Sequence, residues 1–109
     1  MQEYTWISQM DIEKFHNKLS SKTYKNTYIK RIVHWGENGF FLKRKTKNNF
    51  EITYHKAYFK DFTIIDICVV LIEDGIQITA KPSSDLNNSY NLDGKRFDLI
   101  VNLLNEILY

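Results

Sequence analysis

The stretch GFFLKRKTKNNFEITY, residues 39–54, places basic and amide side chains between two apolar flanks. Its two arms, Phe40–Thr46 and Phe50–Phe59, alternate aromatic or branched side chains with polar ones. Such alternation is typical of paired strands that bury one face. The stretch therefore predicts a β-hairpin, and the rest of the fold is built outward from it.

Two registers of this hairpin give its lysines different roles. A two-residue turn at Asn48-Asn49 would set lysines among aromatic side chains on one face, as a platform for single-stranded nucleic acid requires. A three-residue loop, Lys47-Asn48-Asn49, would instead gather the apolar side chains on one face. Burying a Phe or Ile side chain is worth about 1.5–3 kcal/mol, so we favour the second register.

In the favoured register Arg44 alone interrupts the apolar face. The other members of that face are Phe40, Leu42, Thr46, Phe50, Ile52 and Tyr54. The opposite face is expected to be wet, and it carries Lys43, Lys45, Glu51, Thr53 and His55.

After the hairpin, the sequence predicts two further strands, Phe62–Glu73 and Ile76–Pro82. The Asp74-Gly75 pair between them is favoured in two-residue hairpin turns. Residues 83–92 are expected to form a polar loop, and Tyr4–Ile7 fits a short additional strand. The strand at Phe62–Glu73 is apolar on both faces, so both faces need a cover.

Helices are expected at Ser8–Ser21 and from about Asp93 to Leu108. Ser8 can cap the first helix, whose Ile12, Phe15 and Leu19 repeat at helical spacing. The last helix is apolar over roughly 200° of its circumference, against about 100° for an ordinary surface helix. It is therefore either nested in a curled sheet or partly a contact surface.

Residues 22–35 fit two interpretations. A strand at Thr27–Trp35 would be followed by Asn38-Gly39, a strong hairpin signal, and we favour it. The other interpretation is a helix whose apolar stripe consists of Tyr24, Tyr28, Ile32 and Trp35. Residues 1–109 are thus expected to form one α+β domain with an N-terminal helix, an antiparallel meander of four or five strands, and a long C-terminal helix packed on the sheet.

The motifs of several protein classes are missing from the sequence. The three histidines fall on different predicted elements, no Gly-rich phosphate loop is written, and Cys68 has no partner for a disulfide. We expect no cofactor, no metal and no enzyme activity. The start of the sequence lacks a signal-peptide pattern, and no apolar run approaches the roughly 20 residues that span a bilayer. We therefore expect a cytoplasmic protein that does not engage membranes.

Charge is unevenly distributed along the chain. Residues 1–60 hold 12 Lys and Arg against 5 Asp and Glu, whereas residues 61–109 hold 3 against 8. Such an asymmetry favours an acidic partner for one face of the molecule.

Together these features predict a small non-catalytic binding or regulatory module that engages a protein partner, of acidic charge, or a second copy of itself in a homodimer. The final helix and the basic hairpin are the expected contact surfaces. The alternative is a nucleic-acid-binding protein that uses the hairpin around residues 43–47. The candidate binding residues are Lys43, Arg44, Lys45, Lys47, Lys30 and Arg31.

Overall fold

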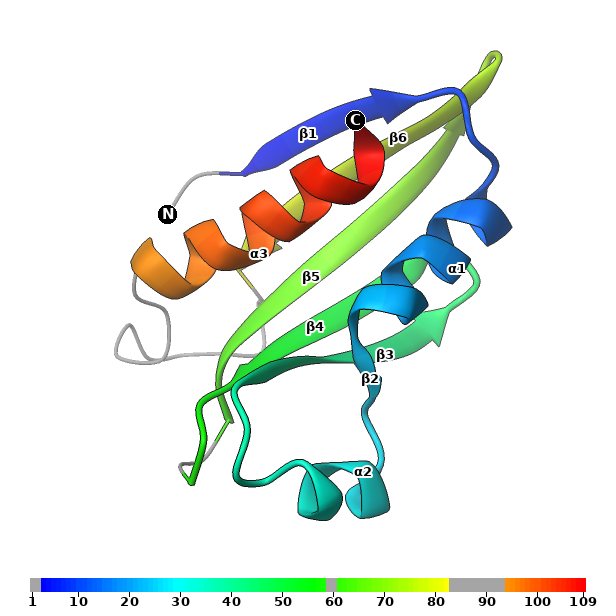
Figure 1. The fold of residues 1–109 in the computed structure, drawn as a ribbon. Coiled ribbons are helices and arrows are strands. Elements are labelled where there is room, and N and C mark those ends of the chain that lie inside the picture. Colours follow the sequence, from blue (N-terminus) through cyan, green and yellow to red (C-terminus); the bar gives the residue numbers. More distant parts are fainter. Residues whose placement is uncertain (1–2, 59–60, 83–93) are drawn as a thin grey trace.

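The computed structural model describes residues 3–58, 61–82 and 94–109. Within these ranges the chain has three helices and a six-stranded, mostly antiparallel sheet, which confirms the predicted α+β class. Figure 1 shows the two longer helices, α1 and α3, on the same face of the sheet. The elements in chain order are β1 Tyr4–Ser8, α1 Ile12–Lys22, β2 Tyr24–Lys25, α2 Tyr28–Val33, β3 Gly39–Thr46, β4 Asn49–His55, β5 Asp61–Ile72, β6 Gly75–Pro82 and α3 Gly94–Leu108.

The strands lie side by side in the order β1-β6-β5-β4-β3-β2. All neighbours are antiparallel except β2 and β3, which are parallel. The run from β3 to β6 is the predicted meander. Strands β1 and β2 extend it at its two edges, so the sheet has six strands instead of four or five. The predicted loop at residues 83–92 and a helix start at Asp93 lie outside the described residues.

The β3–β4 hairpin has the predicted faces, but its turn differs from the prediction. Leu42 stands opposite Ile52 and Arg44 opposite Phe50, so the apolar face is the one that we favoured. The turn is Lys47-Asn48, and the register shifts between Arg44 and Thr46. The extra residue that we assigned to the loop therefore lies in a β-bulge, which keeps the buried face in phase.

The main core lies between this face of the sheet and helices α1 and α3. It contains side chains from every one of the longer elements, and burial of this kind is the dominant stabilising term. Its fully buried members are Phe15, Leu19, Phe50, Ile52, Ile65, Ile78, Ala80, Ile100 and Leu104.

The N-cap of helix α1 lies three residues later than the cap predicted at Ser8. Ser8 is the last residue of β1 and pairs with Ile76. Asp11 caps the helix instead, and its carboxylate accepts a 2.8 Å hydrogen bond from the backbone N–H of Lys14. Strand pairing at Ser8 thus outweighs its preference for a cap position.

The strand predicted at Thr27–Trp35 is wrong, because this segment holds the short helix α2. Thr27 caps it, accepting a 3.3 Å hydrogen bond from the N–H of Lys30. The Asn38-Gly39 pair makes no hairpin turn: neither residue has positive φ, and the Asn38 side chain accepts a hydrogen bond from the N–H of Ala57.

At the end of the hairpin near α2, the far face is more buried than predicted. Thr53 and His55, expected to be wet, are 3% and 1% exposed. Phe41 is buried beside them, and the rings of Phe41 and His55 meet edge to face. The reason is that the chain around Trp35 folds over this end of the sheet and contacts the His55 ring.

Most of the apolar arc of α3 is buried against the sheet, as expected of a helix nested in the fold. Ile100 and Leu104 are fully buried, and Asn105 accepts a 2.7 Å hydrogen bond from the indole N–H of Trp6 in β1. Leu99 is exposed, at 43%. None of the described helices is long and apolar enough to cross a membrane.

Strand β5 is covered on one face by the helices and is partly open on the other. Ile65 and Ile67 are buried in the main core, whereas Val70, which points the other way, is 51% exposed.

The hairpin of β5 with β6 turns at Glu73-Asp74, one residue before the predicted position. A Cβ on Gly75 would collide with the carbonyl oxygen of Ser8, so glycine is needed where β1 ends against this hairpin.

Candidate functional site

The six basic residues predicted as one binding face are divided among separate surfaces. Lys43 and Lys45 lie on the far face of the hairpin, and Lys47 lies in its turn. Arg44 lies on the face that carries the core. Lys30 and Arg31 belong to α2, before the start of β3, and roughly 25 Å of strand separates that start from the turn.

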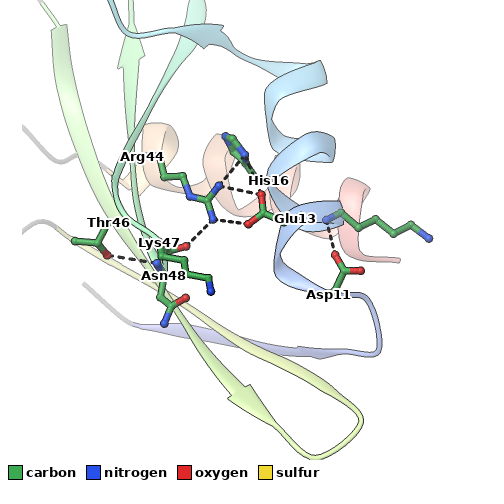
Figure 2. Close-up of polar contacts among 8 residues, drawn as sticks. Asp11, Glu13, His16, Arg44, Thr46, Lys47 and Asn48 are labelled. Atoms are coloured by element: carbon green, nitrogen blue, oxygen red, sulfur yellow. Dashed lines mark hydrogen bonds and ion pairs between the residues drawn. The ribbon is translucent and has the colours of Figure 1, made fainter.

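Arg44 is held against α1 instead of projecting into solvent (Figure 2). Its guanidinium donates to both carboxylate oxygens of Glu13, at 3.0 and 2.9 Å, and to the carbonyl of Lys47 at 2.7 Å. It also contacts Nδ1 of His16 at 3.2 Å and lies 5.2 Å from the centre of the Phe50 ring. Such a two-point pair fixes the geometry of both side chains.

This arrangement shifts the titration of both partners. The hydrogen bonds from Arg44 lower the pKa of Glu13 below its ordinary value of 4.5, and the charge of Arg44 adds to the shift. The same hydrogen bonds raise the pKa of Arg44. The charge of Arg44 is therefore largely balanced within the molecule.

Lys45 also has acidic neighbours. Glu51 and Asp66 stand directly opposite each other on β4 and β5, and the Lys45 ammonium lies 3.8 Å from a carboxylate oxygen of each. Like charges in opposed positions repel. Lys45 thus relieves a repulsion on the sheet.

Lys43 and Lys47 are exposed, but within the described hairpin, residues 39–55, no exposed row of aromatic side chains for base stacking lies beside them. Phe50 and Ile52 have no exposed surface, and both belong to the face that α1 and α3 cover. The exposed lysines can meet an anion by charge alone.

A different surface is formed by α2, and we call it the α2 knob. All six of its side chains are exposed, as the helix buries none of them. At about 100° per residue its apolar side chains share one side, while Lys30 and Arg31 take the other. The apolar members are Tyr28, Ile29, Ile32 and Val33, which are 76%, 71%, 56% and 65% exposed.

The chain on either side of the knob is firmly attached to the sheet. The rings of Tyr24 and His34 stack with their centres 3.7 Å apart. The Trp35 carbonyl accepts hydrogen bonds from the N–H of Tyr58 and from Nε2 of His55, both at 2.9 Å. Because a carbonyl only accepts, Nε2 of His55 carries the proton. The knob is therefore a fixed projection of the fold, and Figure 1 shows it apart from the two longer helices.

A groove of about 500 Å³ lies between α1 and the edge of the sheet where β2 ends. None of the described residues that line it is acidic. They are His16, Ser20, Thr23, Lys25, Asn26, Leu42, Lys43 and Arg44.

No metal centre accompanies these surfaces: among the residues with described positions, no three His, Cys, Asp or Glu side chains gather closely enough to hold an ion.

No protein-family model, curated protein or solved structure matches this chain.

Neither the exposed knob nor the groove was predicted, although a helix with Tyr28 and Ile32 in its apolar stripe was the second interpretation of residues 22–35. The knob did leave a signal: Thr27 is a good cap, and the apolar residues after it are spaced one, three and one apart, as on one side of a helix turn. The groove left none, because it depends on how far β2 follows β3.

Proposed function

We propose that this chain is a small non-catalytic binding module of the cytoplasm, which engages an acidic protein partner through the α2 knob. The observation that carries the proposal is a short helix that exposes four large apolar side chains while its flanks are fixed to the sheet. Contiguous exposed apolar surface marks interaction sites, and a fixed surface loses less entropy on binding.

The charge around the knob supports the choice of partner. Lys30 and Arg31 lie on the helix itself, and exposed Lys25 precedes it. Glu37, an acidic residue that follows the knob, is bound to His34 at 2.7 Å. A partner with an apolar pocket and an acidic rim would complement this surface.

The proposal is tested with a tagged chain purified from its native cell. Truncating a central apolar interface residue costs about 2 kcal/mol, or roughly 30-fold in affinity. The double variant Ile29→Ser, Ile32→Ser should therefore lose the co-purifying partner while keeping its melting temperature. The matched control, Val70→Ser with Leu71→Ser, removes exposed apolar surface at the other end of the sheet and should keep the partner.

Three outcomes would contradict this proposal. In the first, the partner still co-purifies with the knob variant. In the second, the partner is lost only in the double variant Lys43→Glu, Lys47→Glu, as nucleic-acid binding by the hairpin requires. Sedimentation supplies the third: self-association that the knob variant abolishes would make the partner a second copy of this chain.

A further inference from the structure

We propose that the groove beside α1 is a second binding site, which takes an extended acidic peptide segment as an added strand on β3. This site shares Lys25 with the surroundings of the α2 knob but none of the six residues of α2, so either proposal can fail without the other. Its recognition elements are the open edge of β3, the walls of the groove, and two lysines at its rim.

The edge of β3 is open over half of its length. β2 pairs with Phe41 and Leu42, and the Leu42 carbonyl accepts a 2.9 Å hydrogen bond from the N–H of Asn26. Backbone groups alternate in direction along a strand, so those of Arg44 point to the same side as those of Leu42. None of the described strands pairs with β3 on that side beyond Leu42.

The groove gives an added strand a place to lie. Its volume of about 500 Å³ accommodates several side chains of a bound segment. His16 and Ser20 of α1 form one wall, and Asn26 closes the end where β2 stops. A strand that continues the line of β2 would thus run along β3 towards the hairpin turn.

Charge selects which segment can occupy the groove. Lys25 and Lys43 are both exposed at its rim, whereas the charge of Arg44 is balanced by Glu13. A carboxylate on the added strand would satisfy these lysines. A second copy of β3 would bring lysines against lysines, so the same charges disfavour edge-to-edge self-association.

The test uses synthetic eight-residue peptides, because the proposed contacts are backbone pairing and charge. The probe alternates Glu with Val, one comparison peptide carries Lys in place of Glu, and another carries a methyl group on every backbone nitrogen. NMR titration of the folded chain reports the site. We expect the Glu peptide to shift the amide of Arg44 and slow its hydrogen exchange, and the other two peptides to do neither.

Charge-reversal variants locate the contact. Lys43→Glu should weaken binding of the Glu peptide about tenfold or more, the equivalent of about 1.4 kcal/mol. Lys14→Glu makes the same change of charge on an exposed position of α1 outside the groove, and should leave binding unchanged. The knob variant Ile29→Ser, Ile32→Ser should also bind the peptide normally.

Any of four results would overturn the inference: no binding of the Glu peptide at millimolar concentration, equal binding of the Lys peptide, equal binding of the methylated peptide, or binding that leaves the Arg44 amide unchanged. The methylated peptide keeps the charge but cannot pair as a strand, so it separates strand addition from simple attraction of an anion. Inorganic phosphate is a second control for the attraction of an anion.

Discussion

Arg44 shows how one side chain can be out of pattern and still be well placed. In the sequence it interrupts the apolar face of the hairpin, and this position was predicted correctly. Its partner was not predictable, since Glu13 lies 31 residues earlier on another element. The bulge at Lys45 was not predictable either, because the alternation of apolar and polar residues is the same whether the extra residue lies in the turn or in the strand.

The Glu13–Arg44 pair should make stability depend on pH. The pKa of Glu13 is lowered in the folded chain, so its stabilising contribution is complete above the unfolded pKa near 4.5 and is lost as pH falls through the folded pKa. Urea unfolding should find Glu13→Gln less stable than the parent at pH 7. The difference should shrink progressively as the pH is lowered below 4.5.

The control for this prediction removes the other partner. In an Arg44→Met background, Glu13→Gln should have little effect on the free energy of unfolding at pH 7 or at pH 3, because the pair is already broken. An undiminished difference between parent and Glu13→Gln at pH 3 would show that the side chain acts by something other than its charge.

Elements with strong periodicity were predictable, and the weak one was not. The meander and α3 were located from alternation and helical spacing, both of which reflect burial on one face. Helix α2 has an apolar stripe that faces solvent, so the link between pattern and burial fails there. Asn38-Gly39 then added a turn signal that the structure uses differently, with the Asn38 side chain bound to Ala57.

The burial of α3 predicts a sharp contrast between two leucines on one helix. Leu104→Ala empties a fully buried position and should cost about 2–5 kcal/mol in the free energy of unfolding. Leu99→Ala trims a side chain that is 43% exposed, and should cost well under half of that. Urea unfolding measures both. Equal losses would mean that the arc of α3 is not divided as described.

At the scale of the whole molecule, the three described helices cover the sheet unequally. Its core face carries α1 and α3, whereas α2 buries none of its side chains. The sequence predicted the covered face from the apolar arc of α3. It could not predict where the chain between α1 and β3 would go, because that route depends on the contact of Tyr24 with His34.

This unequal layering predicts two levels of protection in hydrogen exchange. Amides of β4 and β5, in the middle of the sheet, should exchange through unfolding of the whole chain, whereas α2 amides should exchange through local opening. Thr27→Ala removes the cap of α2 and should speed exchange in α2 several-fold, since such a cap contributes about 1 kcal/mol. Exchange in β4 should change little. If α2 were as protected as β4, the two levels would not exist.

The place of β1 at the edge next to β6 has a consequence for protein synthesis. β1 leaves the ribosome among the first residues of this sequence, yet its partner strand begins at Gly75 and its indole contact lies at Asn105. Contacts so distant along the chain form late. The nascent chain therefore carries β1 as an unpaired segment at least until β6, Gly75–Pro82, has been translated.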